Sequence, residues 1–145
     1  MELCVSLEKY EICLKQKKVN HSYAREAIYK IFLENTNAFM TISDIQSRLE
    51  ESYPKKVSLN TIYRHLHLFV SCDLVLNIQD DNKKAYYINI DGELPVFELC
   101  SRCQRVDMIR DLTQKQYKSL ADVLDVSKGK KMPYIVIHRT CKRCL

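Results

Sequence analysis

Four cysteines in the second half of the chain have the types and spacing of a metal site. They form two Cys-x-x-Cys pairs, Cys100 with Cys103 and Cys141 with Cys144. Two such turns, brought together, present four thiolates, which is a ligand set of closed tetrahedral zinc sites. We therefore predict one structural zinc ion per chain, bound by these four cysteines and without an open position for chemistry.

Two other interpretations of these pairs remain open. Each pair could form a disulfide, as in a thiol redox protein or a redox-sensing regulator, or the four side chains could be unlinked thiols. The other cysteines, Cys4, Cys13 and Cys72, have no partner at ligand spacing. We interpret them as buried or incidental thiols, with a redox-sensing Cys72 as the alternative.

Length and composition restrict the class of protein. The chain has 145 residues, 46% of them hydrophobic, which suits one ordinary domain or two small ones. No apolar run approaches the roughly 20 residues that span a bilayer, and the N-terminus lacks a signal-peptide core. We expect a cytoplasmic protein. It is not expected to be an enzyme, because the sequence has no Gly-rich phosphate loop, no Ser/His/Asp pattern and no His-Glu-x-x-His.

The net charge of +5 lies in the second part of the chain. Residues 1–91 contain as many acidic as basic side chains, so residues 92–145 carry the excess. Five of these cations flank the cysteines: Arg102, Arg105, Arg139, Lys142 and Arg143. Cations stabilise thiolates, so the basic excess can serve the metal site rather than a nucleic acid.

Hydrophobic periodicity predicts an α+β chain with helices first. Helices are expected at 2–17, 22–35, from 43 to 54, and 58–72, followed by a β-hairpin over 74–90. Beyond a hinge at 91–93 we expect strands at 96–99 and 106–109, a helix at 114–124, a loop at 127–131 and a strand at 134–138. Ser43 is the predicted cap of the third helix, and Thr113, with Gln116, that of the last.

The order of helices and hairpin in residues 1–91 is that of a winged helix, in which the last helix enters the major groove of DNA. The helix at 58–72 is then the reading helix. Asn60 suits an adenine edge, Arg64 a guanine or a phosphate, and Tyr63 a thymine methyl or a phosphate. The alternative is a small helical domain of another kind, with a solvated polar face.

Both halves together resemble the ferric uptake regulator family of transcription regulators. The segment Ser58-Leu59-Asn60-Thr61-Ile62-Tyr63-Arg64-His65-Leu66 is similar to that family's reading-helix signature, and the two Cys-x-x-Cys pairs match its structural zinc ligands. The resemblance implies DNA contacts by Arg25, Thr61, Tyr63 and Arg64. It also implies a homodimer that binds an A·T-rich inverted repeat. We place the winged-helix DNA-binding domain at 1–91 and a zinc-stapled dimerisation domain at 92–145.

The chain departs from the family at the regulatory metal site. Five positions where the resemblance leads one to expect a ligand carry apolar or aromatic side chains: Phe39, Tyr87, Pro95, Phe97 and Met108. We therefore predict a regulator that does not sense iron, manganese or peroxide through that site. The alternative is a displaced site built from Glu98, Asp107, Asp111, His21 or His138. The sequence does not specify the target genes, repression or activation, or the signal that replaces the metal.

Overall fold

The computed structural model describes residues 2–90, 94–124 and 134–145, with side chains from Glu8 onward. The predicted hinge at 91–93 and the loop at 127–131 lie outside these ranges. The described residues form two compact units. Unit 1 runs to Ile78 and includes Ala85–Ile90, whereas unit 2 combines Gln79–Lys84 with the residues from Leu94 on. No helix in the described ranges is long and apolar enough to cross a membrane.

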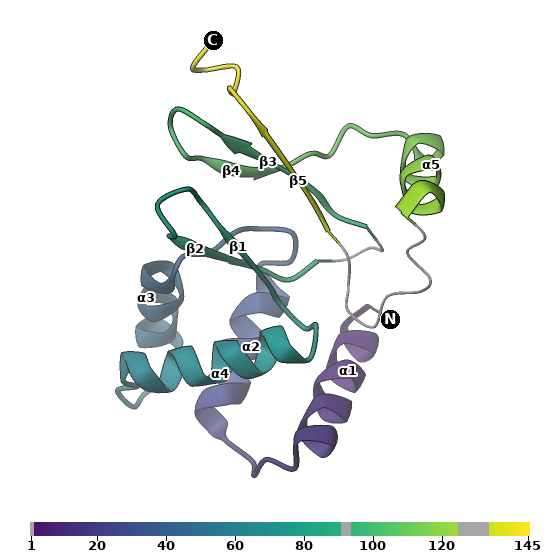
Figure 1. Cartoon of the computed structure of the whole chain (residues 1–145). Coiled ribbons are helices and arrows are strands. Elements are labelled where there is room, and N and C mark those ends of the chain that lie inside the picture. The colour runs from purple at the N-terminus through teal and green to yellow at the C-terminus, as the bar shows by residue number, and fades with distance from the viewer. Residues whose placement is uncertain (1, 91–93, 125–133) are drawn as a thin grey trace. The chain divides into compact units, whose positions relative to one another are not determined.

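Unit 1 contains four helices and most of a β-hairpin (Figure 1). The helices are α1 (Glu2–Lys17), α2 (Tyr23–Glu34), α3 (Ile42–Ser52) and α4 (Leu59–Ser71), and the hairpin strands are β1 (Leu76–Gln79) and β2 (Ala85–Ile88). Each of these elements overlaps a segment predicted from periodicity. The tip of the hairpin, residues 79–84, belongs to unit 2.

The helix starts show which local signals decide the boundaries. Ser22 caps α2 and Ser58 caps α4 through their side-chain oxygens. The predicted cap of α3 was wrong, because Thr41 rather than Ser43 precedes its first residue. Thr41 accepts a hydrogen bond from the Asp44 N–H, and the Asp44 carboxylate accepts one from the Thr41 N–H. This reciprocal pair satisfies two backbone donors, which a cap at Ser43 would leave open.

Unit 2 is built on a three-stranded sheet with the strand order β4-β3-β5. The strands are β3 (Val96–Cys100), β4 (Val106–Met108) and β5 (Ile135–Arg139); β3 pairs antiparallel with β4 and parallel with β5. Helix α5 (Gln114–Leu124) precedes β5 and starts with the predicted Thr113–Gln116 capping box. The parallel pairing places Cys100 beside Arg139, so that the two Cys-x-x-Cys turns lie at the same end of the sheet.

The core of unit 1 lies around one face of α4. Ile62, Leu66 and Phe69 are at most 1% exposed. The ring of Phe69 meets the rings of Tyr10 on α1 and Tyr29 on α2, with centroids 6.2 and 5.4 Å apart. Aromatic pairs at such spacing add to the free energy of burial. The helix that carries the predicted reading residues is therefore oriented by its opposite face.

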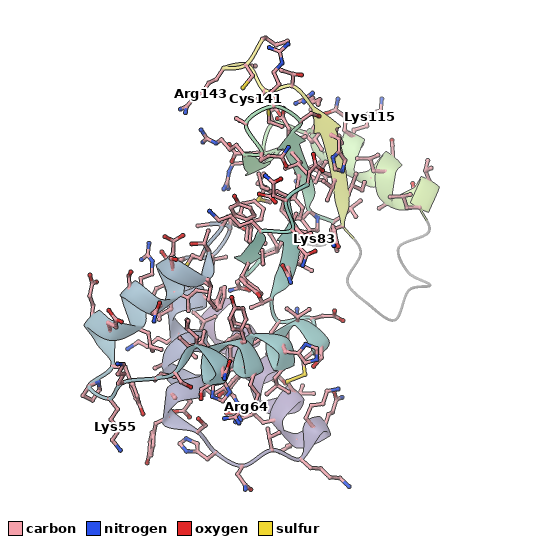
Figure 2. All side chains as sticks on the ribbon, turned by 60° about the vertical axis from the view of Figure 1, so that its left-hand side comes forward. Lys55, Arg64, Lys83, Lys115, Cys141 and Arg143 are labelled. Carbon is pink, nitrogen blue, oxygen red and sulfur yellow. A yellow bond between two sulfur atoms is a disulfide. The ribbon has the colours of Figure 1, made fainter. Side chains whose placement is uncertain are left out.

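One pair of helices in this core is covalently joined. Cys13 on α1 and Cys72 at the end of α4 form a disulfide, with their Cα atoms 5.8 Å apart (Figure 2, yellow bond). Our interpretation of these two cysteines as unpaired thiols was wrong. The folding of α1 onto α4 brings together two residues that are 59 positions apart, which no local spacing reveals. The side chain of Cys4 lies outside the described part of α1.

A single histidine on the buried face of α4 makes unit 1 sensitive to acid. His65 is 3% exposed, and burial, with contributions from Arg25 and Arg64, lowers its pKa to about 4. Because the unfolded chain binds this proton near pH 6.5, stability is fully present above that pH and falls as the pH drops toward 4. We expect a loss of up to about 3 kcal/mol from this group.

Denaturant unfolding between pH 7 and pH 4.5 checks this expectation. His65→Leu should unfold with a shallower dependence of free energy on pH than the unchanged protein, whereas His67→Leu, at an exposed position of the same helix, should retain the full dependence. Equal slopes for all three proteins would contradict a buried neutral histidine at position 65.

Candidate metal centre and candidate nucleic-acid interface

The four predicted zinc ligands lie together in unit 2. The sulfurs of Cys100, Cys103, Cys141 and Cys144 all lie within 4.8 Å of one another, and all four residues are free thiols. A tetrahedron of Zn–S bonds of about 2.3 Å places its sulfurs about 3.8 Å apart. The Cys103 and Cys141 sulfurs are 3.8 Å apart. The cluster therefore has the dimensions of a four-thiolate zinc site.

The turn at Cys100 prepares its sulfur to carry negative charge. The backbone N–H groups of Arg102, Cys103 and Cys141 all donate to this sulfur, at 3.4, 3.5 and 3.3 Å. These hydrogen bonds, that of Cys141 being the strongest influence, lower the pKa of Cys100 to about 6. Donors aimed at a buried sulfur stabilise the thiolate, which is the form that binds metals.

The same crowding prevents the four thiols from ionising together. Hydrogen bonding to the thiol of Cys141, together with burial and the nearness of the other two sulfurs, raises the pKa of Cys144 to about 12. A second or third thiolate in the cluster is therefore unfavourable unless a cation neutralises it. A divalent ion bound at the centre supplies that charge, so the residues present fit a zinc ion.

Three of the five cations that flank the cysteines have hydrogen-bond or ion-pair partners of their own. Arg139 donates to both carboxylate oxygens of Glu98, at 2.8 and 3.2 Å, and Arg105 lies 3.4 Å from Asp107. Arg102 donates to the carbonyl of Cys144 at 2.9 Å, which links the two turns directly. Two of these three arginines thus neutralise carboxylates of the sheet, and the third joins the two cysteine turns.

Gln104, next to the first cysteine turn, holds the hairpin tip in unit 2. Its side-chain oxygen accepts from the N–H of Asp81 at 2.8 Å, and its nitrogen donates to the Asp81 carboxylate at 3.0 Å. This contact was not predicted from the sequence. No local signal connects two residues 23 positions apart, and the pair becomes visible only when the cysteine turn is folded.

The predicted reading residues form one stripe on α4. Asn60, Tyr63 and Arg64 are exposed, and so is His67, which the 3.6-residue period places on the same face. Thr61 is partly buried, and its hydroxyl lies 2.9 Å from that of the cap residue Ser58. Figure 2 shows Arg64 extending from this helix. The geometry offers amide, phenol and guanidinium groups side by side, a combination that suits base edges and phosphates.

Arg25 lies in a different environment from the stripe. It is 8% exposed, and its Nη1 donates to the carbonyl of Asn20 at 2.8 Å, while its Nε has no hydrogen-bond partner. It also lies close enough to His65 and Tyr10 to influence their pKa values. A DNA contact by Arg25 stays a prediction, and the structure gives this residue a second role inside the core of unit 1.

Comparisons with known proteins agree with the fold. Residues 16–128 match the model of the ferric uptake regulator family. The ferric uptake regulation protein of Staphylococcus aureus is 24% identical over 131 residues, which are 90% of this chain and 92% of that protein.

Two solved structures resemble the chain in fold. The ferric uptake regulator Fur of Helicobacter pylori, described as having three functional metal-binding sites, has a TM-score of 0.71 and is 16% identical over 98% of this chain and 93% of that one. A zinc uptake regulator complexed with zinc and DNA has a TM-score of 0.53 and is 17% identical over 97% and 92% of the two chains. The predicted α+β fold, with N-terminal helices and a C-terminal four-cysteine domain, is confirmed.

Substitution of one predicted ligand tests the cysteine centre. Because ligand binding and folding are coupled in small zinc modules, Cys144→Ser should lose bound zinc and the folded sheet of unit 2. Ser101→Ala, inside the other cysteine turn, should keep both. Elemental analysis with thiol counting should give one zinc per chain and four protected thiols in the unchanged protein. Zinc retained in full by Cys144→Ser would exclude this cysteine as a ligand.

Proposed function

Because the chain belongs to the ferric uptake regulator family of DNA-binding transcription regulators, which are not enzymes, we propose that it binds DNA as a zinc-containing homodimer without a regulatory metal. The exposed stripe of Asn60, Tyr63, Arg64 and His67 on α4 is the observation that carries the DNA-binding part of the proposal. The stripe lies opposite the apolar face that packs in the core, as a helix inserted into the major groove requires.

The proposed DNA contacts are divided by chemistry. Arg64 and Asn60 contact base edges, and Tyr63 contacts a thymine methyl or a phosphate. Thr61 and Arg25 complete the set that the family resemblance implies, with Arg25 also supporting the helix from beneath. Lys55 and Lys56, exposed in the turn before α4, supply phosphate contacts that add affinity but no sequence preference.

The proposed homodimer uses exposed apolar surface in unit 2. Val123 and Leu124 on α5 are 82% and 51% exposed, and Tyr134 and Ile137 are 45% and 39% exposed. β5 is also an edge of the sheet among the described strands. Open edges and apolar side chains of this kind favour pairing with another chain. Two copies related by a two-fold axis would present two reading helices to an A·T-rich inverted repeat.

Substitution of the stripe tests this part of the proposal. Arg64→Ala and Tyr63→Ala should each weaken binding to a duplex from the protein's own promoter by about 1–3 kcal/mol. Lys30→Ala, which removes one exposed charge from α2, should weaken it far less. Gel-shift titration, with the number of chains per duplex counted, gives both affinity and stoichiometry. Near-normal affinity in both stripe variants would refute α4 as the reading helix.

Packing supports the proposed loss of the regulatory metal site. Phe97 is 0% exposed, faces Met108 across the β3–β4 pair and lies 6.2 Å from the ring of Tyr134. In unit 1, the ring of Phe39 lies edge-on to that of Tyr86 at 6.3 Å. Side chains at these positions contribute apolar packing where the family resemblance leads one to expect ligands.

Two of the alternative ligands, Glu98 and His21, have other partners. Glu98 is held by Arg139, which lowers the pKa of its carboxyl group, and His21 lies 2.8 Å from Glu26. Within the described residues, the four cysteines are the one group of three or more metal-ligating side chains close enough to share an ion. We therefore favour DNA binding that does not depend on a second metal over a displaced site.

Metal titration distinguishes the two possibilities. The affinity of the zinc-loaded protein for its promoter should be the same with and without added Fe²⁺ or Mn²⁺, and metal content should stay at one ion per chain. A second bound ion, together with a metal-dependent affinity that disappears in Glu98→Ala or His138→Ala, would establish the displaced site instead.

A further inference from the structure

The disulfide between Cys13 and Cys72 lies at the point where α1 is attached to the reading helix. Cys13 is 2% exposed on α1, and Cys72 is the partly exposed C-cap of α4. The bond encloses α2, α3 and α4 in one covalent loop. A change at these two sulfurs therefore acts on the entire helical part of unit 1 and leaves the four-cysteine cluster of unit 2 chemically separate.

Among the side chains of α1 that the structure describes, few besides Cys13 are buried. Among its side chains from Glu8 onward, Tyr10 and Cys13 are buried and Leu14 is partly buried, whereas the others are exposed. Tyr10 stacks on Tyr29 with ring centroids 4.7 Å apart and meets Phe69 at 6.2 Å. With so little apolar area behind it, the described part of α1 depends strongly on the sulfur–sulfur bond for its position against α4.

We propose that Cys13 and Cys72 form a reversible redox site that controls DNA binding through α1 and α4. The inference rests on the proposed function. The disulfide form, in which α1 covers Phe69 and the stripe on the other face of α4 is exposed, is the form with high affinity for DNA. Reduction releases α1, uncovers Phe69 and weakens the support of the reading helix.

The chemistry is that of a thiol pair and a peroxide. In the reduced protein one thiolate attacks a peroxide oxygen, which breaks the O–O bond, gives a sulfenic acid and releases water or an alcohol. The second thiol then attacks that sulfur, the S–S bond forms, and the sulfenic oxygen leaves as water. Two electrons and two protons pass from the cysteines to the peroxide. Low-molecular-weight thiols reverse the step by exchange, and attack at the partly exposed Cys72 sulfur is the accessible route.

The competing explanation is a permanent, structural disulfide. The compartment of the cell bears on the choice between a structural and a redox-sensing disulfide. In a reducing compartment, such as the cytoplasm we propose, disulfides are mostly transient and redox-sensing rather than permanent. The four-cysteine cluster of unit 2 is a second sulfur site, whose four thiolates a bound zinc ion would hold as metal ligands. The variants described below distinguish a response of that cluster from a response of the pair in unit 1. The redox proposal concerns the pair Cys13 and Cys72, which form the disulfide in the described residues.

The test compares zinc-loaded protein treated with hydrogen peroxide and with dithiothreitol, with metal content verified after each treatment. Mass spectrometry of peptides should find Cys13 linked to Cys72 only after peroxide. The oxidised protein should bind its promoter duplex at least about 5-fold more tightly than the reduced protein, at the lower end of typical coupling between sites. Hydrogen exchange in α1 should be faster after reduction.

Variants assign the effect to this pair. Cys72→Ser and Cys13→Ser should bind DNA like the reduced protein under both treatments, whereas Cys4→Ser should respond like the unchanged protein. Equal DNA affinity in both redox states, or no linked peptide after peroxide, would overturn the proposal. If a variant with both Cys13→Ser and Cys72→Ser still changed its DNA affinity between the two treatments, the effect would be assigned to the four-cysteine cluster. Absence of DNA binding in every state, with α1 exchange still redox-dependent, would instead refute the proposed function.

Discussion

The packing around Phe69 is the interaction on which the DNA-binding unit depends. Rings from α1 and α2 meet this side chain, with Tyr10, Tyr29 and Phe32 at centroid distances of 6.2, 5.4 and 6.5 Å. Because an α-helix is rigid along its length, orienting one face by burial also orients the other. The packing around Phe69 thereby fixes the position of the exposed stripe on α4, and α1 takes part in this packing through Tyr10. Burial, rather than the polar residues themselves, makes the stripe a surface of defined shape.

Unit 2 has a different organising constraint, which is electrostatic. Its sheet has three short strands, and α5 has no buried residue among those described, so apolar burial is limited. The four sulfurs at the ends of β3 and β5 can all be thiolates only when a cation neutralises their mutual repulsion. Backbone donors favour a single thiolate at Cys100, and a divalent ion is needed for the rest. We therefore expect the folding of unit 2 to be coupled to metal binding. Unit 1, in contrast, has a hydrophobic core of its own.

Features that depend on a local pattern of residues could be predicted from the sequence. The helices and strands followed from periodicity because most are amphipathic, and the cysteine cluster followed from two matched turns. The cap of α3 was wrong because Thr41 and Ser43 are both good caps, and Asp44 decides between them. Pairings across long separations escaped prediction: Cys13 with Cys72, and Asp81 with Gln104. For Cys72 a signal was present, since it follows the buried residues Leu66 and Phe69 at helical spacing and so belonged to the apolar face of α4.

The two sulfur sites illustrate how one chain keeps opposite chemistries apart. In unit 2, backbone donors favour a thiolate at Cys100, and the four sulfurs are close enough together to share one metal ion. In unit 1, Cys13 lies in the hydrophobic core and Cys72 packs against it, and the two sulfurs are joined as a disulfide. In the proposed function, apolar side chains at the positions expected for a regulatory metal remove one route by which a signal could reach α4. The bond between α1 and α4 provides another, because it acts on the same buried face that orients the stripe.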